Sequence, residues 1–162
     1  MRVRDGGAVL LLLDTEGMLV TGTARAHRRV LEVAVFERCG LLLDTSEHAA
    51  ALTDRGIVRA LLARAGRFGD DEVDWVLELA RDLYPHRAWK ALPGCAVEGM
   101  PHALAALRAA GHRFALCTGD LEAIARVKLE HAGLTATLDG VPGAFGEDAE
   151  DRADLPAIAA AR

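Results

Sequence analysis

A short apolar run that ends in two carboxylates constrains the fold of this chain more than any other feature. The run AVLLLL, residues 8–13, follows a pair of glycines and leads directly into Asp14 and Glu16. Continuous runs of this length, without polar alternation, are typical of strands buried on both faces of a helix-covered parallel sheet. The run therefore predicts a buried strand whose end carries two acids, which mark either a site or an ordinary strand exit.

A second predicted strand ends in a similar way. The stretch HRFALCT, residues 112–118, ends at Thr118 and is followed by Gly119. In parallel α/β sheets, ligands bind beyond the carboxyl ends of the strands. We therefore expect Thr118 and Gly119 to lie at the same rim of the sheet as Asp14 and Glu16.

Helical periodicity dominates the rest of the chain. The expected helices span residues 23–39, 54–65, 70–83, 98–110, 121–134 and 153–162. A third short strand is expected at TATLDG, residues 135–140. This order predicts an α/β fold with a Rossmann-like parallel sheet covered by helices and a helical insertion after the first strand.

Composition excludes several classes of protein. The chain has 162 residues and a net charge of −5, without a block of basic residues, so we do not expect a nucleic-acid partner. The first apolar run is too short for a membrane span or a signal peptide, so we expect no membrane partner. Three dispersed cysteines, Cys39, Cys95 and Cys117, lack metal-ligand spacing and are expected to be reduced thiols in a cytoplasmic protein.

Taken together, the motifs resemble those of the haloacid dehalogenase-like (HAD) hydrolase superfamily. The first motif stands as LLLLDTEGML with Asp14 and Glu16, the second as FALCTGD with Thr118, and the third as IARVKLEHAGL with Lys128. The stretches LPGC and ALTDRGIVRALL resemble those of phosphatase-type members with an all-helical cap. The resemblance implies a Rossmann-like core at residues 1–20 and 93–162 and a cap at residues 21–92.

The resemblance also implies a chemistry, which the residue types suit. Asp14 would attack phosphorus and form an aspartyl-phosphate, and Glu16 would protonate the leaving group and then activate water. Thr118, Gly119 and Lys128 would bind the phosphoryl oxygens. Mg²⁺ held by Asp14 and Glu16 would offset repulsion between the nucleophile and an anionic substrate. The implied activity is a magnesium-dependent phosphatase of a small phosphorylated metabolite.

Three positions depart from the pattern of the family. Glu16 replaces the usual Asp, which moves the carboxylate by about 1.5 Å, and a misplacement of about 1 Å can cost on the order of a hundredfold in rate. Met18 replaces a usual Thr, and Asp120 stands where related phosphatases often carry Asn. These departures favour an alternative, an inactive HAD-like protein that acts as a binding or regulatory partner. A third alternative is a dehalogenase in which Asp14 attacks carbon, although that chemistry does not need the Glu16 carboxylate.

The fourth motif of the family, acids that complete the magnesium site, is expected to be missing. GEDAED, residues 146–151, places Glu147 and Asp151 at the right interval, but the preceding VPGAF is a poor central strand. We therefore expect the C-terminal part of the core to be missing and Mg²⁺ binding to be weak or absent. The first strand would then form an apolar edge, to be completed by a second copy, a separate polypeptide or a rearranged C-terminus.

Several side chains allow an ordinary structural role as well. Lys128 lies two helical turns after Leu121 and shares its inward face, or else it pairs on the surface with Glu122 or Glu130. Thr53 and Asp54 could contribute to the face of the helical cap over the site, but Asp54, like Asp120, is also suited to cap a helix. The histidines are expected at surface or structural positions, and these are His27, His48, His86, His102, His112 and His131.

Overall fold

A parallel sheet lies at the centre of the fold. The computed structural model describes residues 7–40, 42, 52–88 and 95–162, and within them three strands run in the order β1-β2-β3. β1 (Leu10–Leu13) pairs with β2 (Arg113–Cys117), and β3 (Gly143–Ala144) pairs with the other side of β2. The α/β fold expected from the sequence is confirmed. Among the described strands β1 lies at an edge, and its completion by another chain stays a prediction.

The helices follow the expected ranges closely. None of the described helices has the length and apolar content that a membrane crossing requires. The third helix extends past Pro85, to Ala88. The helices are α1 (Ala24–Cys39), α2 (Asp54–Arg64), α3 (Asp70–Ala88), α4 (Met100–Ala109), α5 (Glu122–His131), α6 (Thr135–Leu138) and α7 (Leu155–Ala161), with a 3₁₀ turn at Arg152–Asp154.

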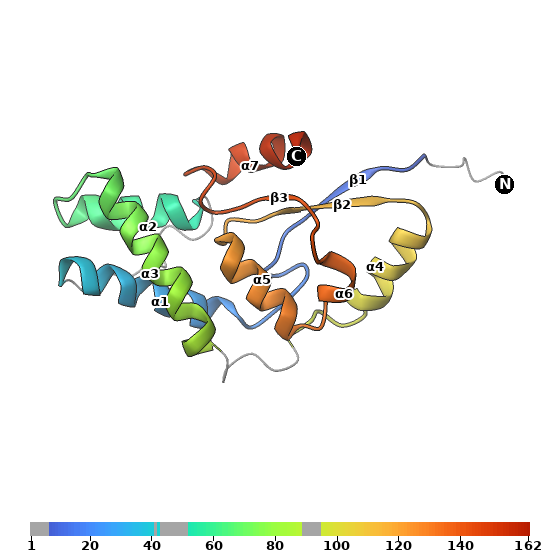
Figure 1. The fold of residues 1–162 in the computed structure, drawn as a ribbon, viewed down its shortest axis with the longest axis horizontal. Coiled ribbons are helices and arrows are strands. Elements are labelled where there is room, and N and C mark those ends of the chain that lie inside the picture. Colours follow the sequence, from blue (N-terminus) through green and yellow to red (C-terminus); the bar gives the residue numbers. More distant parts are fainter. Residues whose placement is uncertain (1–6, 41, 43–51, 89–94) are drawn as a thin grey trace.

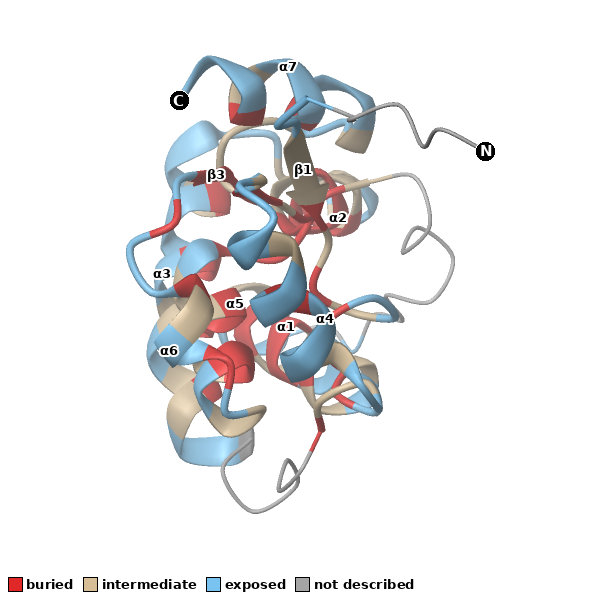
Figure 2. Ribbon diagram, turned by 90° about the vertical axis from the view of Figure 1, so that its right-hand side faces the viewer, coloured by how far each residue is buried: buried red, intermediate tan, exposed pale blue. Residues whose placement is uncertain are grey.

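Helices cover both faces of the sheet (Figure 1). One face packs against α4 and α5, in a cluster that includes Leu13, Leu104 and Leu129. The other face packs against α7, where Ala115 meets Leu155. Figure 2 shows the buried residues inside and exposed surfaces on the outer sides of the helices. The first three residues of β1 are only half-buried, less than the sequence predicts, because this strand lies at the edge.

The third strand lies later in the chain than the sequence predicts. Residues 135–140 are expected to form a strand, but Thr135–Leu138 form α6, in which the Leu138 amide donates to the Leu134 carbonyl at 3.0 Å. β3 forms instead at Gly143–Ala144. A Cβ on Gly143 would lie 2.8 Å from the Leu116 carbonyl oxygen, so a glycine is needed for this close approach.

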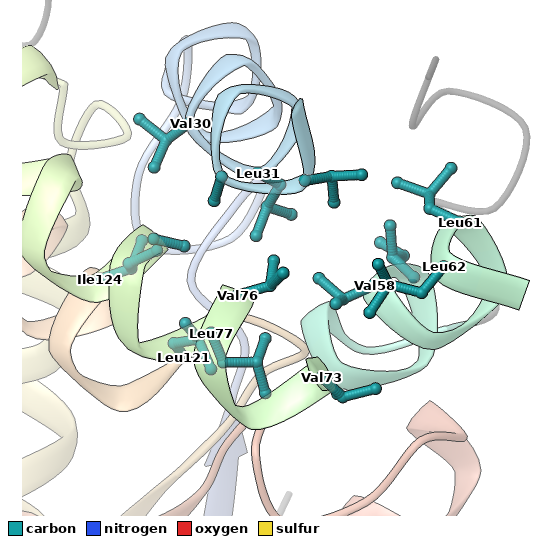
Figure 3. Close-up of a cluster of buried hydrophobic side chains, with 14 of the residues drawn as sticks. Val30, Leu31, Val58, Leu61, Leu62, Val73, Val76, Leu77, Leu121 and Ile124 are labelled. Atoms are coloured by element: carbon teal, nitrogen blue, oxygen red, sulfur yellow. The ribbon is translucent and has the colours of Figure 1, made fainter. Parts of the chain in front are cut away.

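Helices α1, α2 and α3 pack together beside the sheet (Figure 1). Val30 of α1, Val58 of α2 and Val76 of α3 are at most 1% exposed. They share one apolar cluster with Leu121 and Ile124, which join it from the start of α5 (Figure 3). The division into a cap and a core stays a prediction, because its boundary at residues 92 and 93 and most of the LPGC stretch lie outside the described residues.

The start of α2 is tied to the segment that follows β3. Thr53 is the N-cap of this helix, since its hydroxyl accepts from the Gly56 amide at 3.2 Å. The Thr53 amide donates to the Glu150 carbonyl at 3.1 Å, and the Asp54 amide donates to the Gly119 carbonyl at 2.8 Å. A Cβ on Gly56 would collide with the Glu150 carbonyl. These contacts hold α2 directly over the carboxyl ends of the strands.

Candidate active site

A cavity of about 210 Å³ lies at the carboxyl ends of β1 and β2, bordered by α1 and α2. Four carboxylates and four basic side chains line it, so opposite charges are balanced along its walls. The charged lining residues are Asp14, Glu16, His27, Arg28, Asp54, Asp120, Lys128 and Arg152.

Lys128 lies at the centre of a buried network. Its side chain is fully buried, and its Nζ lies 2.8 Å from Asp120 Oδ2, 3.2 Å from His27 Nδ1 and 4.0 Å from Glu16 Oε2. A buried ammonium needs a partner such as the Asp120 carboxylate, because its desolvation is costly. The inward direction predicted from the two-turn spacing after Leu121 is confirmed, and a surface pair with a glutamate of α5 is excluded. Asp120 does not cap α5 but pairs with Lys128.

His27 and Asp54 join the network from α1 and α2. His27 Nε2 lies 2.9 Å from Asp54 Oδ2, and His27 Nδ1 lies 3.3 Å from Asp120 Oδ1. The Asp54 carboxylate also accepts from the Leu121 amide at 2.8 Å. Sequence reasoning missed His27, which it placed with surface or structural histidines. For Asp54 it left open the cap face and a helix cap, and the helix cap is the place that Thr53 takes. The available signal was that His27 precedes Val30 by one helical turn, on the apolar face of α1.

The charges of this network shift the pKa values of its members. Burial alone would lower the pKa of His27, but the carboxylates of Asp54 and Asp120 outweigh burial and the charge of Lys128, and they raise it to about 9. Burial would raise the pKa of Asp120, but Lys128 and His27 hold it well below its usual range. His27 is therefore an imidazolium and Asp120 a carboxylate at neutral pH.

The stability of the fold should fall as pH rises from about 6.5 to about 9. A histidine whose pKa is raised on folding contributes its full stabilisation at pH values below the pKa of the unfolded state. This contribution is lost as pH rises through the pKa of the folded state. The shift of His27 corresponds to about 3 kcal/mol. Urea unfolding across this range should show the decline in wild type, and His27→Gln should abolish it.

The matched control for this prediction is His86→Gln, because His86 is an exposed histidine on α3. This variant should keep the decline of wild type.

The groups that face His27 are Asp54, Asp120 and Lys128, together with the Tyr84 ring, whose centroid lies 5.7 Å away. An unfolding free energy that stays level between pH 6.5 and 9 in wild type would contradict the raised pKa.

Asp14 and Glu16 line the same cavity, and each is held by a different partner. Asp14 Oδ2 accepts from the Arg152 guanidinium at 2.7 Å, and Asp14 Oδ1 accepts from the Thr15 amide at 2.8 Å. Glu16 Oε2 accepts from the Thr23 hydroxyl. Arg152 is a further residue that sequence reasoning missed, because it lies in an acid-rich loop segment without periodicity.

Thr118 lies behind the cavity wall rather than on it. Its side chain is buried, and its Oγ1 lies 2.7 Å from Thr15 Oγ1, while the Thr15 hydroxyl also donates to Asp120 Oδ2 at 2.5 Å. Gly119 does line the cavity. Of the five residues expected from the sequence, the structure thus brings Asp14, Glu16, Gly119 and Lys128 to one cavity and places Thr118 behind it.

The arrangement around Asp14 and Glu16 does not fit a magnesium ion. Mg²⁺ requires near-octahedral oxygen ligands, but both oxygens of Asp14 are engaged and one partner is itself a cation. Among the described residues, the group with metal-ligand spacing is His27, Asp54 and Asp120. The Lys128 ammonium already lies against this group, 2.8 Å from Asp120.

The two acids proposed for a fourth motif do not reach the cavity. Glu147 accepts from the Glu122 amide at 3.0 Å, at the start of α5. Asp151 accepts from the Ala153 amide at 2.8 Å and caps the 3₁₀ turn. Neither carboxylate could complete a metal site with Asp14 in this arrangement.

Comparison with one solved structure supports the fold. The chain is similar to a hydrolase from Pseudomonas syringae, with a TM-score of 0.64, 14% identity, and coverage of 90% of this chain and 64% of that one. It is also similar to a HAD family hydrolase from Deinococcus radiodurans R1 with bound phosphate and sodium, with a TM-score of 0.39, 31% identity, and coverage of 82% and 55%. The chain thus spans less than two thirds of either relative.

The family follows from a sequence comparison. No curated protein matches this chain. A family model described as haloacid dehalogenase-like hydrolase matches residues 11–162, nearly the whole chain. This range contains the acids after β1, the loop after β2 and the lysine of α5, in the order expected from the sequence. The chain belongs to the haloacid dehalogenase-like hydrolases.

Proposed function

We propose that this chain hydrolyses a small phosphoric monoester, with Asp14 as the nucleophile. The observation that supports it best is that Asp14 and Glu16 share one cavity with the cations of Lys128, His27 and Arg152. Carboxylates alone would repel an anionic ester, and the cations offset that repulsion. The volume of about 210 Å³ suits a small metabolite.

The proposed reaction has two displacement steps. In the first, an Asp14 oxygen forms a bond to phosphorus while the bond from phosphorus to the ester oxygen breaks, and the Glu16 carboxyl gives its proton to the departing alcohol. In the second, the Glu16 carboxylate takes a proton from water as the water oxygen attacks phosphorus. The bond between phosphorus and Asp14 then breaks, which releases inorganic phosphate and restores both carboxyl groups.

The buried network would position these groups rather than react. Lys128 is held by Asp120, and Glu16 Oε2 lies 4.0 Å from its ammonium. This fixed positive charge would attract an anionic ligand into the cavity. Because α1 and α2 border the cavity, they would also exclude water during the first step.

The test is release of inorganic phosphate from p-nitrophenyl phosphate and from a panel of small sugar phosphates. Wild type should release phosphate from at least one of these esters, and Asp14→Asn should not. Equal background release by both proteins would overturn the proposal.

A second candidate function is binding of a phosphorylated metabolite without turnover. The ion pair between Arg152 and Asp14 favours it, because it engages the proposed nucleophile. In that case the esters of the panel would raise the thermal stability of the protein while no phosphate is released.

A further inference from the structure

Asp14 forms an ion pair with Arg152, so its carboxylate is not free to bind a cation as an unpaired carboxylate would be. Arg152 Nη2 lies 2.7 Å from Asp14 Oδ2, and the Arg152 side chain is 34% exposed at the edge of the cavity. The other oxygen of Asp14 accepts from the Thr15 amide. Because a guanidinium keeps its charge at any physiological pH, the Asp14 carboxylate has a permanent positive partner.

Arg152 is held in this place from both sides along the chain. Just before it, Glu150 accepts from the Thr53 amide at 3.1 Å, at the start of α2. Just after it, Leu155 and Ala159 of α7 are buried against the sheet. The residue therefore stands on a short span between two packed anchors and is not a freely moving surface arginine.

The loop after β2 also shapes the space for this guanidinium. A Cβ on Gly119 would lie 3.1 Å from Arg152 Nη1, closer than side chains normally pack. The glycine therefore leaves room for Arg152 to pass over the loop and reach Asp14. Three separate segments, the loop after β2, the start of α2 and the turn before α7, thus define the position of one positive charge.

We infer that Arg152 is a built-in counter-cation of Asp14 that keeps divalent cations off this carboxylate. A metal cation bound to Asp14 would lie at contact distance from the guanidinium and would be repelled by its charge. The guanidinium would also occupy one of the two carboxylate oxygens of Asp14. Glu16 offers at most its other oxygen, because its Oε2 accepts from the Thr23 hydroxyl. The guanidinium instead remains available to an anion, since it has several donors and Asp14 uses one.

The test is a titration of the full chain with Mn²⁺ alone, followed by electron paramagnetic resonance of the free ion. Arg152→Gln should bind Mn²⁺ at least about tenfold more tightly than wild type, which corresponds to about 1.4 kcal/mol. Adding Asp14→Asn to this variant should return the affinity to that of wild type. Circular dichroism shows whether each variant folds, and Arg152→Met, which keeps the aliphatic stem, replaces the glutamine variant if that one does not.

The matched control is Arg162→Gln. Arg162 also pairs with a carboxylate, that of Asp148 at 2.7 Å, but it does not line this cavity. Its loss should leave Mn²⁺ affinity unchanged. If wild type and Arg152→Gln bind Mn²⁺ with equal affinity, or if neither binds it, the inference is overturned. It is also overturned if the tighter binding of Arg152→Gln persists when Asp14→Asn is added.

The inference rests on the site of the proposed function but not on turnover. A chain that binds Mn²⁺ as expected and releases no phosphate would refute the proposed hydrolysis and leave the role of Arg152 standing. A chain that hydrolyses esters but shows no effect of Arg152→Gln on Mn²⁺ binding would refute the role of Arg152 and leave the proposed hydrolysis standing.

Discussion

Replacing Lys128 by methionine should lower the free energy of unfolding by about 3 kcal/mol. Methionine fills a similar volume, so the loss would come from charge rather than from a cavity. Lys128 is fully buried, and its ammonium is the nearest cation to Asp120, at 2.8 Å against 3.3 Å for His27. Without it the two carboxylates of Asp120 and Asp54 would share only the charge of His27. Urea unfolding followed by circular dichroism measures the change.

The control for this prediction is Glu130→Gln, because Glu130 is an exposed charge on the same helix. Its loss should change the free energy of unfolding by less than about 0.5 kcal/mol. The double variant Lys128→Met with Asp120→Asn should be less destabilised than the sum of the two single variants, since the neutral amide no longer needs a counter-charge. A Lys128→Met protein within about 1 kcal/mol of wild type would contradict the buried network.

Replacing Asp14 by asparagine should lower kcat by at least about a thousandfold, since loss of a covalent nucleophile removes the reaction path itself. The amide is nearly isosteric but a poor nucleophile, and it also gives up the charge that pairs with Arg152. Steady-state release of inorganic phosphate measures the effect. Asp82→Asn, which removes an exposed carboxylate on α3, should leave kcat unchanged.

A residual rate close to that of wild type in Asp14→Asn would show that another group attacks the ester. Glu16→Gln gives a second reading of the same site. A positioned acid or base contributes about a hundredfold to ten-thousandfold, so this variant should retain more activity than Asp14→Asn. The reverse order would contradict the roles assigned to the two acids.

Local patterns predicted the parts of the fold that depend on short stretches of sequence. The apolar run at residues 8–13 contains β1, and the stretch 112–118 contains β2. The two-turn spacing from Leu121 to Lys128 indicated the buried position, one of the two that were left open for this lysine. Each of these features follows from the period of a helix or a strand. Residues 135–140 misled the same reasoning, because Thr135–Leu138 form a separate short helix after the left-handed Gly133 that ends α5.

The remaining site residues depend on how distant segments pack. His27 and Asp54 reach Asp120 only because α1, α2 and α3 share an apolar cluster with the start of α5. Arg152 reaches Asp14 only because α7 packs on the sheet while the preceding residues hold the start of α2. The spacing of His27 and Val30 could indicate an inward histidine, but no spacing in the sequence tells which distant segments meet. A charge in a polar loop, such as Arg152, is normally solvated.

The most direct test of the account is mass spectrometry of protein that has been mixed with a hydrolysed phosphoric monoester and quenched in acid. The peptide that contains Asp14 should carry a phosphoryl group on that residue in wild type and none in Asp14→Asn. Turnover by wild type without this adduct, or with the phosphoryl group on a different side chain, would contradict the assignment of Asp14 as the nucleophile.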